Sequence, residues 1–334
     1  MDVMRPKLIN LDGVQFRVNP FFHPAINPSG EETAFSSYNN DEEFADPNLV
    51  ETVDGFQLAF HVPQALYKFI IGKKGETKRR IEQETGTRLS LPPNSREEDS
   101  DVVINGGTAR AVLLAKSKID LLVANGRQRL EFTHFISIPF NANAIIDSFE
   151  KFKKLVIAGN PCLNPGLFQT PSKLHLTLCT LQLLDGSEMK RAEEILEEVK
   201  LDIQPHFSEI RPKLSLNGLE YMNDDPSAVD VLYGKIASED IDIQSIADII
   251  LERFYQSGLS HDVKTSRVKL HVTLLNSLFL SDEQHSRQTF DARNIFKNFK
   301  DFHFGKIDFN CVQLSQRHST TNAGYYRVAA HIDL

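Results

Sequence analysis

Two short stretches of the sequence place a histidine and a threonine two residues apart. The first reads Lys-Leu-His-Leu-Thr-Leu over residues 173–178, and the second reads Lys-Leu-His-Val-Thr-Leu over residues 269–274. In a β-strand, residues i and i+2 face the same side, so each histidine projects together with its threonine while the apolar residues fill the other side. The polar residues concerned are His175, Thr177, His271 and Thr273.

Two imidazoles and two hydroxyls around one phosphorus atom can cleave a phosphodiester without a metal. One histidine takes a proton from the attacking water or hydroxyl, the other gives a proton to the departing oxygen, and the threonines hold the non-bridging oxygens. Imidazole suits this work because its unperturbed pKa, about 6.5, lies near neutral pH. The pattern leaves open which histidine is the acid, and whether the site turns a substrate over or only binds a phosphate.

The two motifs lie in an internal repeat. Each half of residues 128–334 predicts a strand, an amphipathic helix, the motif strand, a further helix and a further strand. We expect the strands over 134–140, 173–178, 214–220, 229–236, 269–274, 304–314 and 325–332, and the helices over 145–156, 187–199, 243–254 and 292–299. If the halves pair about an approximate two-fold axis, the two imidazoles meet across one cleft.

Three neighbours of the motifs are weaker candidates. Cys179 continues the alternation of the first motif, so we expect it to line the cleft. Lys173 and Lys269 precede their histidines by two residues and are expected on the same strand face, either attracting phosphate or simply solvated. Two histidines do not specify zinc, and the chain has no HExxH sequence and no P-loop, so we expect neither a metal nor a cofactor.

A basic turn lies earlier in the chain. Six lysines and arginines stand between Lys68 and Arg80 against the single acid Glu76, although the chain as a whole is acidic. The segment Gly72–Gly75 enters a helix expected over 75–85, where glycines allow close approach and free helix amides point at an anion. The candidate nucleic-acid-binding residues are Ile71, Gly72, Lys73, Lys74, Gly75, Lys78 and Arg79.

Residues 67–77, which read Tyr-Lys-Phe-Ile-Ile-Gly-Lys-Lys-Gly-Glu-Thr, resemble the signature of a type I KH domain. The resemblance covers about 52–126, where the pattern predicts strand, helix, helix, strand, strand and helix, with Gly86 capping the second helix and Gly126 ending the third. It implies that the Gly-x-x-Gly loop clamps single-stranded RNA, or single-stranded DNA. The alternative is a KH fold that only packs against a protein partner.

The paired motifs resemble those of the 2H phosphoesterase family, whose members act on cyclic phosphates or RNA ends. The expected fold class is therefore α+β, with a type I KH domain followed by a two-lobed, pseudo-two-fold 2H phosphoesterase-like domain of antiparallel sheets flanked by helices. We expect a flexible acidic arm over 1–51, the KH domain over 52–127 and the 2H domain over 128–334.

The combination of both domains, together with residues 218–226 and 229–233, resembles a family of subunits of a nuclear coactivator complex. That resemblance implies a helicase-containing complex, transcription coactivation, repair of alkylation damage and a nuclear location. Two functions remain open: an enzyme that opens or trims a phosphate at an RNA end, and an RNA-binding adaptor whose cleft only binds a phosphate or nucleotide. The intact motifs favour the enzyme, and the net charge favours the adaptor.

The composition limits the number of domains and the class of protein. The chain has 334 residues, 41% of them hydrophobic, which is enough for two cores, and a net charge of −8 excludes a protein coated in positive charge. Three scattered cysteines indicate a reducing compartment, and neither a signal peptide nor a membrane span is readable. The acidic arm is either a solvated tail or a docking segment anchored by its phenylalanines, which are Phe21, Phe22, Phe35 and Phe44.

Overall fold

The computed structural model describes residues 8–11, 14–17, 46–92, 101–207, 211–260, 267–280 and 287–334. The chain divides into two units, Met1–Ala45 and Asp46–Leu334, which we describe separately. In the first unit, β1 (Leu8–Leu11) pairs with β2 (Val14–Arg17) in an antiparallel hairpin. Of the rest of the predicted arm over 1–51, residues 46–51 belong to the second unit, where Leu49–Thr52 forms a strand. The other predictions for the arm, including its four phenylalanines, concern residues outside those described.

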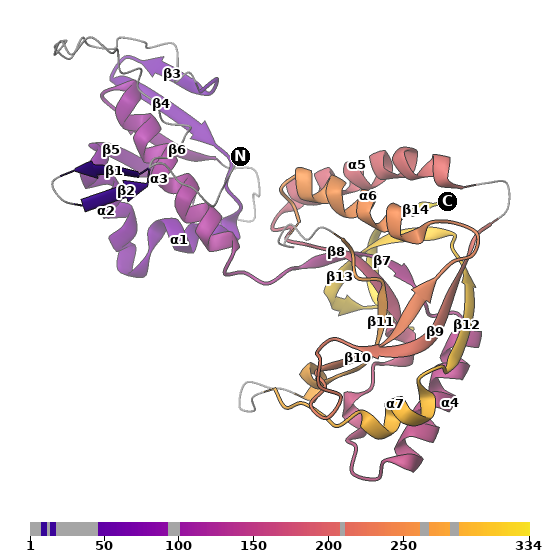
Figure 1. Ribbon diagram of the computed structural model, residues 1–334. Coiled ribbons are helices and arrows are strands. Elements are labelled where there is room, and N and C mark those ends of the chain that lie inside the picture. Colours follow the sequence, from indigo (N-terminus) through magenta and orange to yellow (C-terminus); the bar gives the residue numbers. More distant parts are fainter. Residues whose placement is uncertain are drawn as a thin grey trace. The chain divides into compact units, whose positions relative to one another are not determined.

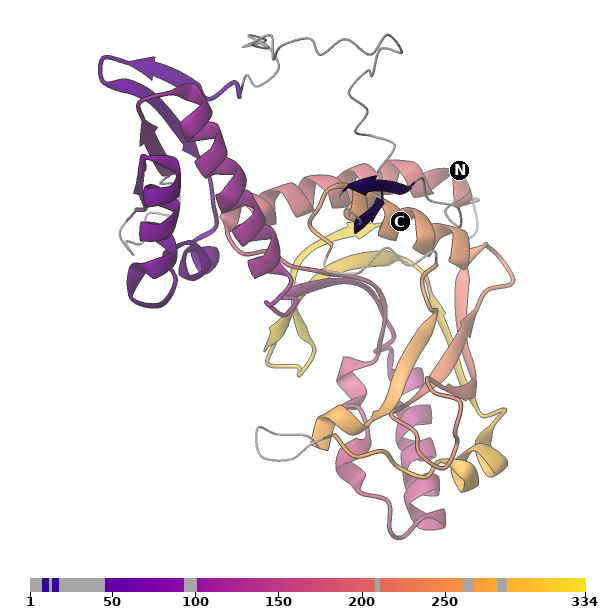
Figure 2. The same ribbon diagram turned by 60° about the vertical axis from the view of Figure 1, so that its left-hand side comes forward.

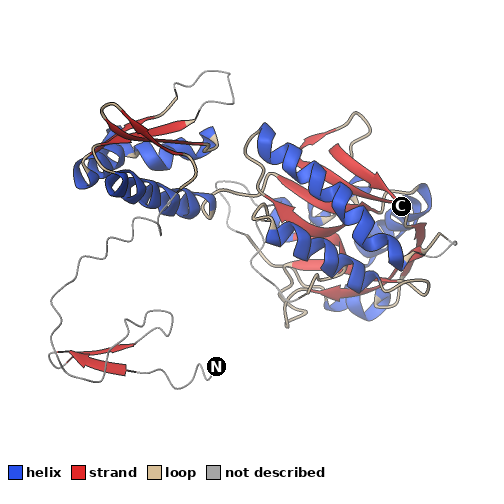
Figure 3. Cartoon of the chain, turned by 90° about the horizontal axis from the view of Figure 1, so that it is seen from above, coloured by secondary structure: helices blue, strands red, loops and turns tan. Residues whose placement is uncertain are grey.

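The second unit begins with a four-stranded antiparallel sheet carrying three helices. The sheet order is β3-β4-β6-β5, and Figure 3 shows the helices gathered on one side of these strands. The strands are β3 (Leu49–Thr52), β4 (Gly55–Phe60), β5 (Thr87–Ser90) and β6 (Val102–Gly106). The helices are α1 (Tyr67–Ile71), α2 (Glu76–Thr85) and α3 (Ala109–Arg127), with 3-10 turns η1 (Gln64–Leu66) and η2 (Lys73–Gly75). After β3, the order is the predicted one.

The ends of these helices follow from local residues, with one correction. Gly86 ends α2 in the left-handed conformation as predicted, and Thr108 caps α3 by accepting a hydrogen bond from the amide of Ala111. Gly126 does not end α3, because the helix continues to Arg127. A Cβ at Gly126 would lie 2.4 Å from the Phe69 ring, so this glycine lets α3 pack closely against α1.

Residues 134–334 form one eight-stranded sheet with helices. The strand order is β12-β9-β10-β11-β8-β7-β13-β14, and every adjacent pair is antiparallel. The strands are β7 (His134–Pro139), β8 (His175–Leu181), β9 (Lys213–Tyr221), β10 (Val231–Ala237), β11 (His271–Asn276), β12 (His303–Asp308), β13 (Cys311–Thr320) and β14 (Tyr326–Asp333). The two halves meet at β8 and β11 through one register pair, Leu176 with Val272.

Each half of the sheet has its own helices (Figures 1 and 2). In one half α6 contacts β8 and α5 contacts β14, and in the other α4 contacts β12 and α7 contacts β9. The helices are α4 (Asn143–Gly159), α5 (Gly186–Ile203), α6 (Ile243–Gln256) and α7 (Arg293–Phe299), with 3-10 turns η3 (Pro165–Leu167), η4 (Pro171–Lys173), η5 (Gln204–His206) and η6 (Ser277–Leu280). Their apolar faces and the sheet share one core, separate from the core around α1, α2 and α3. No helix in the described ranges has the length and apolarity to cross a bilayer.

Candidate functional site

The two His-x-Thr motifs come together at the junction of β8 and β11. Leu176 and Val272 are opposite one another in the antiparallel register, and both are fully buried. The residues on either side of each project to the other face of the sheet. In an antiparallel pair this places His175 beside Thr273 and His271 beside Thr177, and all four side chains are half-buried. In the described part of the chain, neither threonine hydroxyl has a protein partner, so both are available to a ligand.

Both imidazoles are held by the same backbone contact. Nδ1 of His175 lies 2.7 Å from the carbonyl oxygen of Lys173, and Nδ1 of His271 lies 2.6 Å from the carbonyl oxygen of Lys269. A carbonyl only accepts hydrogen bonds, so Nδ1 carries the proton in each ring. In the neutral form the remaining nitrogen, Nε2, therefore has a free lone pair that can take a proton from water.

Burial lowers the pKa of both histidines. Desolvation lowers the pKa of His175 to about 4, and the nearby His271 adds to the effect. Desolvation also lowers the pKa of His271, and the charge of Lys269 acts in the same direction. The hydrogen bonds to Lys173 and Lys269 oppose these shifts. Without a ligand, both rings are therefore neutral near neutral pH.

Each imidazole packs against a tyrosine that carries a lysine ammonium on its ring. Tyr326 lies 5.3 Å from His175 and Tyr233 lies 5.4 Å from His271, measured between ring centroids. Nζ of Lys173 is 5.1 Å from the centre of the Tyr326 ring, and Nζ of Lys269 is 4.9 Å from the centre of the Tyr233 ring.

Sequence reasoning missed both tyrosines. Lys173 belongs to η4, which Pro171 opens, and Lys269 precedes β11, so neither lysine is a strand residue as predicted, but both ammonium groups lie over the tyrosines that pack against the histidines. Tyr233 is adjacent to Thr273 only through the register of β10 with β11, and Tyr326 comes from β14 at the edge of the sheet. No local pattern signals either contact.

Cys179 lies in the core, so the expectation that it lines the cleft is wrong. The pairing of β7 with β8 passes from Ile136–Cys179 to Ser137–Thr177, which leaves Leu178 as an extra residue in a bulge. Beyond the bulge the alternation is reversed, and Cys179 is only 2% exposed. β11 has the same shift immediately after its threonine, where the pairing with β10 skips Leu274.

The predicted nucleic-acid-binding residues surround η2. Gly72 has φ of 70°, and a Cβ there would meet the Thr77 hydroxyl at 2.1 Å, so this position requires glycine. Lys73 and Lys74 are exposed, and Lys74 also has a positive φ, of 52°. Ile71 is 37% exposed beside this loop.

The last two predicted residues differ in what they contact. Nζ of Lys78 is 4.0 Å from a carboxylate oxygen of Glu82. Arg79 turns back onto the loop, donating hydrogen bonds to the carbonyls of Lys74 and Gly75. Its guanidinium therefore supports the loop backbone in this structure, while Lys73 and Lys74 are exposed and form no ion pair with any residue that the structure describes.

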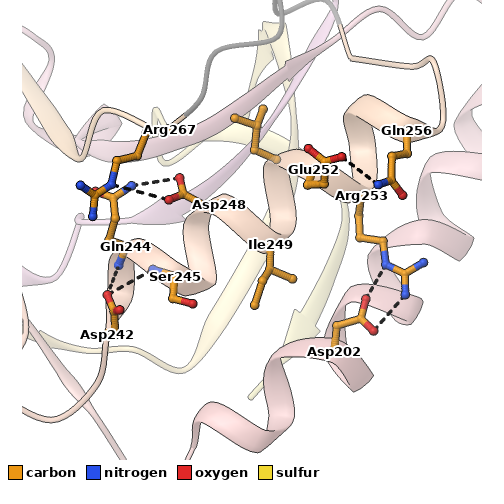
Figure 4. A pocket seen from close by; sticks show the side chains of 11 residues that line it. Asp202, Asp242, Gln244, Ser245, Asp248, Ile249, Glu252, Arg253, Gln256 and Arg267 are labelled. Atoms are coloured by element: carbon orange, nitrogen blue, oxygen red, sulfur yellow. Dashed lines mark hydrogen bonds and ion pairs between the residues drawn. The ribbon is translucent and has the colours of Figure 1, made fainter. Parts of the chain in front are cut away.

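A hollow of about 730 Å³ lies elsewhere, on the helices α5 and α6 (Figure 4). Both of its arginines are already paired, because Arg253 donates two hydrogen bonds to Asp202 and Nε of Arg267 is 3.7 Å from a carboxylate oxygen of Asp248. We assign no ligand to it. Among the residues described, no cluster of three or more histidine, cysteine or acidic side chains is arranged to hold a metal ion.

Comparisons with known families match both parts of the chain. Residues 132–334 match the AKAP7 2'5' RNA ligase-like domain, and residues 57–121 match the KH domain. These matches confirm the predicted fold class, a KH domain followed by a 2H phosphoesterase-like domain.

Relatives match over different lengths. Activating signal cointegrator 1 complex subunit 1 of Mus musculus is 35% identical, over 100% of this chain and 99% of that protein. Far upstream element-binding protein 1 of Homo sapiens is 35% identical over 75 residues, which are 22% of this chain and 12% of that protein.

Two solved structures are similar to part of the chain. LigT of E. coli is 13% identical, covers 61% of this chain and 98% of its own, and has a TM-score of 0.36. A protein of Thermus thermophilus is 15% identical, covers 60% of this chain and 97% of its own, and has a TM-score of 0.40.

Proposed function

We propose that this chain is an RNA-binding phosphodiesterase. The chain belongs to the AKAP7 2'5' RNA ligase-like domain family and, over its full length, to the family of activating signal cointegrator 1 complex subunit 1. Its substrate is an RNA end or a cyclic phosphate. The observation that carries the proposal is the meeting of the two motifs at the Leu176–Val272 pair, with both imidazoles held through Nδ1 and both threonine hydroxyls free of partners in the described residues.

The proposed reaction on a 2′,3′-cyclic phosphate uses both rings through Nε2. One imidazole takes a proton from water as the water oxygen attacks phosphorus, one ribose P–O bond breaks, and the other, protonated imidazole gives its proton to the departing oxygen. Thr177 and Thr273 donate to the non-bridging oxygens as charge builds. We assign the base to His175, whose pKa is lowered to about 4, and the acid to His271, which takes up a proton when the anionic phosphate binds.

The KH domain supplies the second half of the proposal. The exposed Lys73 and Lys74 and the glycine-lined turn suit the backbone of single-stranded RNA. We divide the chain into the arm over 1–51, the KH domain over 52–127 and the 2H domain over 128–334. The two separate cores support the division between the KH and 2H domains, whereas β3 and Leu49 belong to the KH sheet and core and extend that domain into the predicted arm. From the full-length match to the mouse subunit we extend to this chain a place in a nuclear, helicase-containing complex for transcription coactivation and alkylation repair.

A second candidate function is a non-catalytic RNA-binding adaptor whose cleft only holds a phosphate or nucleotide. The net charge of −8 favours it, because this charge opposes binding of long polyanions outside a few local sites. The full-length similarity to a protein named as a complex subunit also fits this role.

The deciding experiment offers the purified chain an oligoribonucleotide with a 2′,3′-cyclic phosphate, with a chelator present. We expect ring opening that does not depend on metal, and a loss of about 10²–10⁴-fold in rate for His175→Ala or His271→Ala. His303→Ala, which removes an exposed imidazole on β12, serves as the matched control and should retain activity. Absence of turnover by the unaltered chain on cyclic and linear phosphate ends would establish the adaptor instead.

A further inference from the structure

A second hollow, of about 470 Å³, is lined by residues of β9, β10 and α7 and of the turn that follows β9. Its lining includes part of the 218–226 stretch, for which the proposed reaction has no use. The residues that matter here are Glu220, Asn223, Asp224, Lys235, Phe296 and Lys300. The hollow thus combines two ammonium groups, two carboxylates and, with Tyr221, two aromatic rings.

The hollow is connected to the catalytic face through Lys235. This residue is directly opposite His271 in the register of β10 with β11, so both side chains leave the same face of the sheet. From there Lys235 passes across β9 at Gly218, where a Cβ would lie 3.0 Å from Lys235 Cε and 3.4 Å from its Nζ. Gly218 has φ of 75° and no side chain, so it leaves the path open for the lysine.

The two cations in the hollow are free to bind an anion. Lys235 and Lys300 are both exposed, and neither forms an ion pair with any residue in the described ranges. Nζ of Lys300 lies 5.7 Å from the centre of the Phe296 ring, which keeps the ammonium at the hollow without neutralising it. An unpaired pair of ammonium groups suits a phosphodiester.

The acidic groups of the hollow suit a sugar hydroxyl. Glu220 lies beside the Tyr233 hydroxyl, where burial and this carboxylate raise the pKa of Tyr233 to about 12. Asp224 is exposed, whereas Asn223 is occupied within its own turn by Ala228 and Asp230. Carboxylates that retain free oxygens accept hydrogen bonds from ribose hydroxyls, as in nucleotide sites generally.

We infer that this hollow is a binding subsite for the ribonucleotide on the 5′ side of the nucleotide that carries the reacting phosphate. Its phosphodiester contacts Lys235 and Lys300, and its ribose hydroxyl contacts Glu220 or Asp224. The inference rests on the proposed function, because it takes the reacting phosphate to lie between His175 and His271. It defines the substrate class as an RNA chain of two or more nucleotides rather than a cyclic mononucleotide.

The test compares a dinucleotide ending in a 2′,3′-cyclic phosphate with the corresponding cyclic mononucleotide. A dinucleotide adds one phosphodiester and is shorter than the four-nucleotide stretch that a KH domain clamps. In the full-length chain we expect the dinucleotide to have the higher kcat/KM, and the double variant Lys235→Gln with Lys300→Gln to raise its KM about 5–30-fold. The mononucleotide should be unaffected. Lys297→Gln, on the same helix turn as Lys300 but outside the hollow, is the matched control and should change neither substrate.

A parallel measurement separates this inference from the proposed function. Calorimetric binding of the same two nucleotides with 3′-phosphate ends does not require turnover. Suppose that neither cyclic substrate reacts, but the unaltered chain binds the dinucleotide more tightly than the mononucleotide and the double variant does not. The proposed reaction is then wrong, and the subsite inference is confirmed. The subsite inference is overturned, whatever the rate of turnover, by either of two results. The unaltered chain binds the dinucleotide and the mononucleotide equally tightly, or the double variant loses affinity for both equally.

Discussion

Protonation of His175 should destabilise the fold in a measurable pH window. The folded state holds the pKa of this histidine at about 4, against an unperturbed value of 6.5. Between these values the unfolded chain binds the proton and the folded chain does not, so the free energy of unfolding decreases as pH falls. Linkage gives a loss of about 2.5 kcal/mol from His175 alone between about pH 7.5 and about pH 4.5.

The variant His175→Asn isolates this contribution. Asparagine keeps a donor that can bond the Lys173 carbonyl and removes the titrating group. We would measure urea unfolding of both proteins at the two pH values and compare the losses, so that all other titrating groups cancel. The variant should lose about 2.5 kcal/mol less than the unaltered chain. His303→Asn, at an exposed site, controls for loss of a histidine as such. Equal losses in His175→Asn and the unaltered chain would refute the desolvation of this imidazole.

Two further predictions concern the KH domain. The double variant Lys73→Asp with Lys74→Asp should weaken binding of single-stranded RNA, measured by fluorescence titration. The slope of the logarithm of the binding constant against the logarithm of the salt concentration should become shallower by about 1.4. An unchanged slope would place the RNA-binding surface elsewhere. Gly126→Ala should lower the free energy of unfolding by about 1–3 kcal/mol, measured in urea, because its Cβ would overlap Phe69. The control Gly159→Ala, with open space around it, should not lower it. Equal effects of the two substitutions would contradict the packing argument.

Much of the site was predictable because it depends on local rules. The period of two holds along each motif as far as its threonine, so the shared face of His175 with Thr177 and of His271 with Thr273 follows from the sequence. The duplication indicated two equivalent strands, and the register pair at the sheet junction brings them together as the repeat required. The glycine pattern around the basic turn was readable for the same reason, since positive φ is a local demand.

The features that escaped prediction depend on neighbours distant in sequence. The bulge at Leu178 arises from pairing with β7, so the reversal that buries Cys179 has no signal in its own strand. Glycine often ends a helix, so the sequence predicted a helix end at Gly126. This glycine instead allows the close contact with Phe69, which depends on tertiary packing. Pro171 was a readable signal that the strand begins after Lys173, and the alternating pattern obscured it.

The repeat gives the two histidines equal motifs but unequal surroundings, and the inequality comes from the end of the chain. Tyr233 reaches His271 from the strand next to β11, whereas Tyr326 reaches His175 from β14, three strands away from β8 in the sheet order. That contact requires the sheet to curl over His175, where Phe135 adds a second ring at 5.0 Å. The extra cover removes more water from His175, which accounts for its lower pKa. This difference, which the C-terminal hairpin creates and the motifs do not, is the basis on which we propose His175 as the base and His271 as the acid.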